Sequence, residues 1–192
     1  IYFGVRKAVE MDNSSNYLVI DIGGGSVEFI ICNNSNMFWK QSFLLGGARL
    51  IQRFEPADPV TDEQIEKIYQ FFDIELLELK EALKKYPVQK IVGSSGAYDS
   101  FAEMLFQAKN KQPMPKNIKT NLISLTGFKQ IYQQLITSTY DDRLCMPGLE
   151  PLRVETIVMA ALLTKYALSL TNATEIIQSA YSLKEGVAAT FN

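Results

Sequence analysis

Three consecutive glycines follow an aspartate at the end of an apolar run, and they constrain this chain more than any other feature. The run Tyr17–Ile22 contains Asp21, Gly23–Gly25 follow directly, and Val27–Ile31 is again rich in β-branched and aromatic residues. This order predicts a strand, a glycine turn and a second strand. Glycine has no Cβ and reaches φ > 0 without steric cost, so the N–H groups of such a turn can converge on one anion. The residues expected to bind phosphate are Gly23, Gly24, Gly25 and Ser26.

Two acidic residues flank this turn at matching positions. If Gly24 and Gly25 form a two-residue turn, Asp21 lies opposite Glu28 across the two strands. Like charges in opposite positions destabilise a hairpin, so a purely structural hairpin has no use for two acids there. A metal ion or a polarised water between the carboxylates would explain them. The alternative is a plain tight hairpin, which needs only one or two glycines.

The glycine-containing segments do not match three better-known motifs. A dinucleotide fingerprint requires a helix after its glycines, whereas Val27–Ile31 favours a strand. A P-loop requires a Gly-Lys pair, which the chain lacks. The segment Gly93–Gly96 is one residue too short for a nucleophile elbow, and the chain contains no histidine to serve as its base.

Composition excludes several classes of function. The 192 residues carry a net charge of −2 and are 47% hydrophobic, which predicts one globular core and argues against nucleic acid held by a basic surface. No apolar run reaches the length of a membrane span, and the first residues do not resemble a signal peptide. The cysteines, Cys32 and Cys145, form no metal or redox motif, so a cytoplasmic location with reduced thiols is expected. Because histidine is absent, carboxylates must carry any acid–base chemistry.

The rest of the chain alternates strands and helices. Met37–Leu45 predicts a third strand, and Thr61 and Gln64 have the spacing of a capping box at the start of a long helix. The buried stripe of that helix consists of apolar residues at three- and four-residue steps: Ile65, Ile68, Phe72, Leu76, Leu79 and Leu83. We expect a helix end or connector at 1–9, strands at 88–92 and 175–180, helices at 98–107, 126–137, 152–170 and from 183, and a lysine-rich loop at 108–121.

A second glycine-containing turn joins the strand expected at 88–92 to the helix expected at 98–107. A helix N-terminus adds partial positive charge to free N–H groups, so this turn can also face an anion. The alternative is that its small residues serve packing alone. If the turn does bind phosphate, the contacting residues are Gly93, Ser94, Ser95 and Gly96.

Taken together, these motifs resemble those of a known family. Asp21–Phe29 is similar to the D-I-G-G-G-S-T-E-L motif of the exopolyphosphatase and guanosine pentaphosphate phosphatase (Ppx/GppA) family, with Val27 in place of threonine. Leu45–Leu50 resembles the family's L-G-x-x-R-L turn, Val92–Gly96 its G-x-S-G turn, and Ser182–Val187 its closing L-R-E-G-V. The resemblance spans nearly the whole chain.

The resemblance implies an α/β fold of the ribonuclease H-like, actin-type ATPase kind, with a five-stranded mixed sheet and helices on both faces. It implies that residues 1–192 form a single domain, the C-terminal lobe of the phosphatase core. The first lobe, with an essential glutamate and its own phosphate-binding hairpin, is then absent from this chain. A lone lobe is expected to fold but to hydrolyse almost nothing, because half of the charge stabilisation is missing.

The implied chemistry is metal-assisted hydrolysis of a phosphoanhydride. Glu28 is expected to activate the attacking water, and Asp21 and Glu28 to hold Mg²⁺. The expected partners are polyphosphate or guanosine phosphates and the missing first lobe, without nucleic acid or a membrane, and a homodimer is left open. Arg49, Arg153 and Glu155 are expected to stabilise helix ends or the lobe.

Two other functions share this architecture. One is a lobe of a sugar or acetate kinase, against which Glu28 argues, because a phosphoryl acceptor site does not require a water-activating acid. The other is a non-catalytic regulatory lobe that binds ATP or guanosine phosphates. The sequence does not distinguish polyphosphate from guanosine pentaphosphate as the substrate of a hydrolase.

Overall fold

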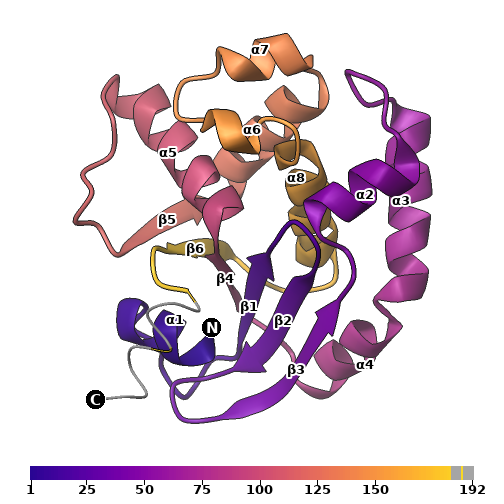
Figure 1. The fold of residues 1–192 in the computed structure, drawn as a ribbon. Helices are drawn as coiled ribbons and strands as arrows, with labels where there is room; N and C mark the ends of the chain where they lie inside the picture. Colours follow the sequence, from indigo (N-terminus) through magenta and orange to yellow (C-terminus); the bar gives the residue numbers. More distant parts are fainter. Residues whose placement is uncertain (183–186, 188–192) are drawn as a thin grey trace.

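The computed structural model describes residues 1–182 and 187 and shows a single mixed β-sheet with helices packed on it (Figure 1). The strand order is β3-β2-β1-β4-β6-β5. The strands are β1 (Tyr17–Ile22), β2 (Val27–Cys32), β3 (Met37–Phe43), β4 (Lys90–Ser94), β5 (Thr120–Ser124) and β6 (Glu175–Ser179). Strands β1, β4 and β6 are parallel to one another, and β2, β3 and β5 pair in antiparallel fashion with their neighbours.

The sheet has six strands, so the prediction of five was wrong. The additional strand is β5, at the end of the segment expected to be a lysine-rich loop. This strand lies at the edge of the sheet and pairs only with β6, and its Leu122 is 65% exposed while Ile123 is buried. An edge strand with one buried apolar residue has no hydrophobic alternation for sequence analysis to detect.

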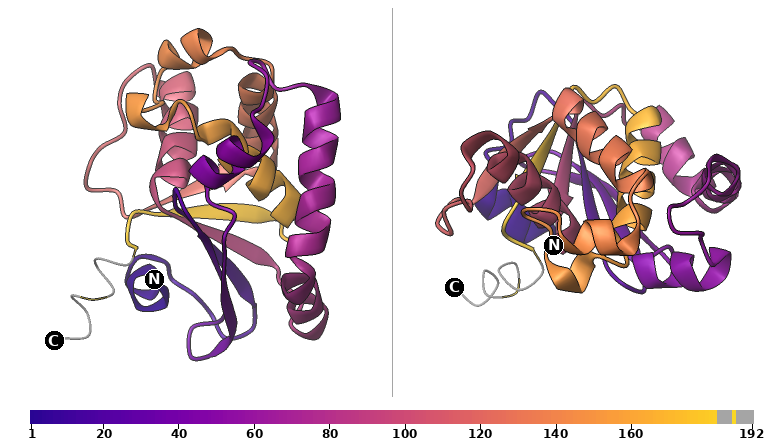
Figure 2. Two further views of the ribbon diagram at one scale, coloured as in Figure 1. Left: turned by 45° about the vertical axis from the view of Figure 1, so that its right-hand side comes forward. Right: turned by 90° about the horizontal axis from the view of Figure 1, so that it is seen from above.

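Helices cover both faces of the sheet, as predicted. The helices are α1 (Tyr2–Ala8), α2 (Gly47–Phe54), α3 (Asp62–Glu75), α4 (Leu77–Lys85), α5 (Gly96–Asn110), α6 (Leu125–Ile136), α7 (Tyr140–Leu144) and α8 (Ile157–Ser169), with a short 3₁₀ helix, η1 (Pro151–Arg153). On one face Tyr17 and Val19 of β1 pack with Val5 of α1, whereas Leu18 and Ile20 face the large core formed with α2 to α6 and α8. Figure 2 shows α1 across the sheet from α5 and α8. The helix expected from 183 falls almost entirely outside the described residues.

The buried character of β1 follows from this two-sided covering. A strand buried on both faces is apolar at consecutive positions rather than at alternate ones. In β1 every residue is buried except Asp21, which is partly exposed at the carboxyl end of the strand. The single charged residue of the central hairpin strand therefore lies where β1 leaves the core.

The long helix after Pro59 begins as predicted and ends earlier. The Thr61 side chain accepts a hydrogen bond from the Gln64 N–H, and the Gln64 side chain accepts one from the Thr61 N–H, which is the predicted capping box. The helix then breaks at Leu76, where α3 gives way to α4. The predicted stripe is buried across both helices, since Leu79 and Leu83 of α4 belong to the same core.

Candidate active site

The predicted site residues of the first turn lie at the carboxyl end of β1, where the β1–β2 hairpin meets the start of α2 (Figure 1). The Gly23 N–H donates to the Ser26 carbonyl at 2.9 Å, which closes a two-residue turn with Gly24 and Gly25 at its tip. This confirms the predicted register, in which Asp21 pairs with Glu28.

The turn does not use the backbone freedom for which its glycines were expected. Among the described glycines only Gly148 has a positive φ, so Gly23, Gly24 and Gly25 do not require one. What the turn requires is close approach, because a Cβ on Gly46 would lie 2.4 Å from the carbonyl carbon and oxygen of Gly24. The missing side chain of Gly46 therefore lets the start of α2 touch the hairpin backbone, whereas a Cβ on Gly24 would meet nothing within 4 Å.

Helix α2 holds the hairpin through its first N–H groups. The Gly47 N–H donates to the Gly23 carbonyl at 3.1 Å, and the Ala48 N–H donates to the Gly24 carbonyl at 3.0 Å. Within the described part of the chain, the N–H groups of Gly24, Gly25 and Ser26 donate to no protein acceptor. The carbonyls of the turn are thus used by α2, while three N–H groups remain for an anion. The sequence predicted a turn at Leu45–Leu50 and did not predict α2.

Glu28 is oriented by two serine hydroxyls. Both the Ser26 Oγ and the Ser42 Oγ donate to the Glu28 Oε1, each at 2.7 Å. Ser42 belongs to β3 and is the cross-strand partner of Glu28. Among the hydrogen bonds of the described residues, none involves the Glu28 Oε2. One carboxylate oxygen is therefore anchored and the other is free to accept a proton.

Ser42 was missed by the sequence analysis, and Ser26 has a contact that the analysis did not foresee. The Ser26 hydroxyl, expected to face phosphate, instead donates to Glu28. The signal for Ser42 was its position in the third strand, where antiparallel pairing with the second strand places one residue opposite Glu28. Locating that residue requires the length of the second turn, which the sequence did not define.

Asp21 is partly buried at the end of β1. Burial raises the pKa of the Asp21 carboxyl, the neighbouring Glu28 charge raises this pKa further, and the hydroxyls of Ser95 and Ser94 oppose the rise. Ser94 is the partner of Asp21 in the β1–β4 ladder. The Ser94 Oγ is fully buried and makes no hydrogen bond to a described group.

The donor set fits magnesium. Mg²⁺ uses one or two carboxylates together with phosphate oxygens and retained waters rather than a cage made by protein alone. Asp21 and Glu28 provide two carboxylates, and neither forms an ion pair with a described cation. In the described part of the chain, no group of three or more histidine, cysteine, aspartate or glutamate residues is placed to hold a metal ion by itself.

The second predicted turn lies beside Asp21, and its small residues have specific protein neighbours. A Cβ on Gly93 would lie 2.0 Å from the ring of Tyr98, and one on Gly96 would lie 2.2 Å from the guanidinium of Arg153. The Ser95 hydroxyl contacts the backbone of Ile22. The structure therefore brings both predicted turns together at the carboxyl ends of the neighbouring strands β1 and β4. Phosphate contact by the second turn stays a prediction.

Two arginines, expected to be structural, approach these turns without forming an ion pair among the described residues. Burial raises the pKa of the nearby Asp99, and the Arg153 charge opposes this rise. The Arg153 guanidinium lies on Gly96 at the start of α5, and the Arg49 Nε lies 3.9 Å from the position of a Gly25 Cβ. No ion pair of the described residues includes either side chain, and the Arg153 Nε is buried without a hydrogen-bond partner. A guanidinium at a helix N-terminus is repelled by the helix dipole. Both arginines are thus placed to meet an anion.

A polar chain of hydrogen bonds continues from the second turn to the edge strand. The Gln178 Nε2 donates to the Asp99 Oδ1 at 2.7 Å, and the Asn121 Nδ2 donates to the Gln178 Oε1 at 2.8 Å. Gln178 is 1% exposed, and it directly follows the apolar residues Ile176 and Ile177 in β6. The sequence signal for this network was a glutamine directly after two isoleucines in the last predicted strand.

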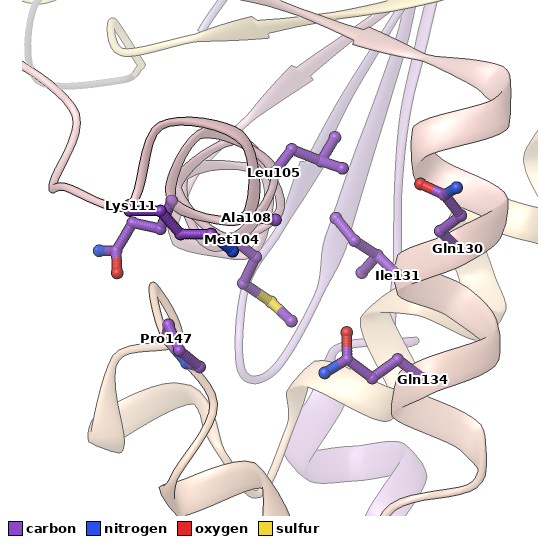
Figure 3. Close-up of a pocket in the computed structure, with 9 residues that line it drawn as sticks. Met104, Leu105, Ala108, Lys111, Gln130, Ile131, Gln134 and Pro147 are labelled. Carbon is purple, nitrogen blue, oxygen red and sulfur yellow. The ribbon is translucent and has the colours of Figure 1, made fainter.

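Two hollows in the surface differ in whether residues of the candidate site line them. A groove of about 520 Å³ between α1 and the β2–β3 pair ends at Glu28 and Ser42. A separate pocket of about 480 Å³ between α5 and α6 is lined by Met104, Ile131 and several glutamines, and none of the predicted site residues reaches it (Figure 3). In the described residues, no helix combines the length and the apolar character needed to cross a bilayer.

The fold and this cluster define a class: an α/β domain of the actin-type ATPase fold that presents two carboxylates and a glycine hairpin at the carboxyl end of β1. Residues 1–190 match the model of the Ppx/GppA phosphatase family. The chain belongs to this family.

Solved structures and a curated relative agree with this assignment. The whole chain is 39% identical to an exopolyphosphatase from Cytophaga hutchinsonii, with a TM-score of 0.95, and covers 61% of that chain. It shares its fold with a PPX-GPPA enzyme from Aquifex aeolicus, with a TM-score of 0.84 and 22% identity over 98% of this chain and 60% of the other. A Haemophilus influenzae protein named "Putative exopolyphosphatase" is 24% identical over 187 residues, which make up 97% of this chain and 55% of that protein. The chain therefore spans little more than half the length of this curated relative.

Proposed function

We propose that this chain is one half of a phosphoanhydride hydrolase that releases terminal phosphate from inorganic polyphosphate, guanosine pentaphosphate or both, with Mg²⁺. The observation that carries the proposal is the pairing of Asp21 with Glu28 across β1 and β2, next to a turn with free N–H groups. The name of the Cytophaga hutchinsonii relative, an exopolyphosphatase, supports the same chemistry.

In this proposal the glycine hairpin binds the terminal phosphate. The N–H groups of Gly24, Gly25 and Ser26 donate to its oxygens, since they have no acceptor in the described protein. Arg49, beside the first turn, and Arg153, beside the second, offset the phosphate charge. Positioning and charge neutralisation supply most of the rate in phosphoryl transfer, so the lobe needs no covalent nucleophile.

Glu28 activates the attacking water. With its Oε1 held by Ser26 and Ser42, the free Oε2 accepts a proton from the water as the water oxygen bonds to phosphorus. The phosphoanhydride P–O bond on the opposite side breaks, and the shortened chain leaves. Asp21 and Glu28 would hold Mg²⁺, which would supply charge neutralisation at the phosphate oxygens.

Phosphate release tests this function in a protein that contains this chain together with the first lobe. With Mg²⁺ present, we expect that two-lobe protein to release phosphate from at least one of polyphosphate and guanosine pentaphosphate. This chain alone should be slower by about 10²-fold or more, because electrostatic and positioning groups of the other lobe are missing. The measurement is inorganic phosphate formed with time, for both proteins at equal concentration.

Each alternative has its own outcome in this assay. Equal turnover by the lone chain would place the whole catalytic apparatus within these 192 residues. Transfer of the phosphoryl group to an added alcohol or acetate instead of water would indicate a kinase. Tight binding of guanosine phosphates without release would indicate a regulatory lobe.

Replacing Asp21 by asparagine should raise stability and weaken the metal response. The folded protein holds the Asp21 proton more tightly than the unfolded chain does, because burial raises this pKa. Between the two pKa values the unfolded state binds fewer protons, so stability falls as the pH rises through this window. Asp21→Asn removes this cost at neutral pH, so its free energy of unfolding should exceed that of the wild type at pH 7, and the difference should shrink in acid.

The same variant should need at least roughly 10–100-fold more Mg²⁺ for half-maximal turnover in the two-lobe protein, the range typical of losing even an outer-shell partner of a metal. Urea unfolding at several pH values and magnesium titration of turnover are the measurements. Asp141→Asn, on the exposed surface of α7, is the matched control and should change neither quantity. An unchanged magnesium requirement in Asp21→Asn would remove Asp21 from the metal site.

A further inference from the structure

Ser95 has a backbone conformation that few residues other than glycine adopt. Its φ of 83° and ψ of 169° place it between β4 and α5, as the residue before the helix begins. Glycines occur on both sides of the turn, at Gly93 and Gly96, but not at this strained position. Strain of this kind persists where the surrounding structure requires it and gathers at functional sites.

The Ser95 side chain does not cap α5, although it occupies the N-cap position. Its hydroxyl instead reaches β1. The Ile22 N–H donates to the Ser95 Oγ at 3.2 Å, and the Ser95 Oγ donates to the Ile22 carbonyl at 3.0 Å. Both backbone groups of Ile22 are thus satisfied by one hydroxyl.

This contact extends the β1–β4 ladder past its last backbone pair. The regular register ends at Asp21 and Ser94, because the chain turns away at Ser95 to start α5. A hydroxyl can donate and accept at once, so it replaces the N–H and the carbonyl that a further strand residue would have offered. An alanine or a glycine at this position offers neither group.

Ile22 lies between Asp21 and the glycine turn, so holding its backbone in place also holds Asp21 and the turn in place. We propose that Ser95 is a positioning residue, whose hydroxyl holds the end of β1 so that Asp21 faces Glu28 and the turn keeps its orientation. The catalytic consequence of this role rests on the proposed function. The hydroxyl proton is used by the Ile22 carbonyl, and phosphate contact by Ser95 stays a prediction.

Two substitutions distinguish the effect of losing the Ser95 hydroxyl from the effect of relieving the backbone strain. Ser95→Ala removes the hydroxyl and keeps a Cβ at φ > 0, whereas Ser95→Gly removes both the hydroxyl and the strain. Ser100→Ala is the matched control, because the Ser100 Oγ donates within α5 to the Gly96 carbonyl and does not contact β1. All three are made in the two-lobe protein and compared with the wild type.

We expect Ser95→Ala and Ser95→Gly to lower kcat by roughly 10–100-fold and to raise the Mg²⁺ concentration for half-maximal turnover, as loss of an outer-shell partner does. The KM for substrate should change less than kcat, and Ser100→Ala should match the wild type. Ser95→Gly should have the higher Tm of the two, which reverses the usual order of alanine and glycine. Wild-type kcat and magnesium response in Ser95→Ala would overturn the proposal, as would full activity in Ser95→Gly.

Hydrogen exchange provides a readout that does not depend on the reaction. The Ile22 amide should exchange faster in both Ser95 variants than in the wild type or Ser100→Ala. Unchanged exchange of this amide would overturn the positioning role. If the wild-type two-lobe protein releases no phosphate, the proposed function fails, but the exchange of Ile22 and the order of the Tm values still decide whether the Ser95 contact holds β1.

Discussion

Glu28→Gln should reduce kcat of the two-lobe protein by about 10²–10⁴-fold, the range for loss of a general base. The amide keeps the shape of the side chain and can still accept the hydroxyls of Ser26 and Ser42 through its oxygen, so the local structure should persist. It cannot take a proton from water. We therefore expect KM for substrate to change little, with the loss confined to kcat.

Steady-state phosphate release at a series of substrate concentrations measures both constants. Glu78→Gln is the control, because Glu78 is exposed in the first turn of α4, far in sequence from the hairpin. Turnover within a few-fold of the wild type in Glu28→Gln would show that another group activates the water. A large increase in KM with kcat retained would instead assign Glu28 to substrate binding.

Gly46→Ala should destabilise the lobe and disorganise the hairpin together. The new methyl carbon would lie 2.4 Å from the Gly24 carbonyl atoms and 2.5 Å from the Gly25 carbonyl carbon. These are backbone atoms, so either the hairpin or α2 must move. Overpacking of this kind costs about 1–3 kcal/mol of unfolding free energy, occasionally more.

The measurements are urea unfolding of this chain and the amide NMR shifts of the hairpin during phosphate titration. Gly24→Ala is the control for stability, because a Cβ there meets nothing within 4 Å. In Gly46→Ala we expect the phosphate-induced shifts of Gly25 and Ser26 to weaken or vanish. Stability and shifts equal to those of the wild type would show that α2 does not hold the hairpin in place.

The sequence predicted the hairpin well because its information is local. Asp21, the glycines and Glu28 lie within eight residues, so the turn length alone determines which of them pair. The capping box of α3 is local in the same sense, and it was also confirmed. Patterns of this kind depend on neighbours in the chain and not on the rest of the fold.

The parts of the site that were missed depend on contacts between distant segments. The Ser95 hydroxyl bonds a residue 73 positions away, and Arg153, which lies on Gly96, belongs to η1. The neighbouring sequence does not indicate that an arginine belongs to a site, because an arginine on the surface and one that faces a ligand have no distinguishing local pattern. Edge strand β5 was missed for a related reason, since its pairing with β6 is what makes it a strand.

In the proposed function, the contact between α2 and the hairpin strengthens the N–H donors that would face the phosphate. The Gly24 carbonyl, which accepts from the Ala48 N–H, shares its peptide group with the Gly25 N–H, and the Gly23 carbonyl shares one with the Gly24 N–H. A peptide group whose carbonyl accepts a hydrogen bond is polarised, so its N–H becomes a stronger donor. The partial positive charge at the start of α2 thus reaches the anion through two intervening amides, without α2 itself touching the ligand.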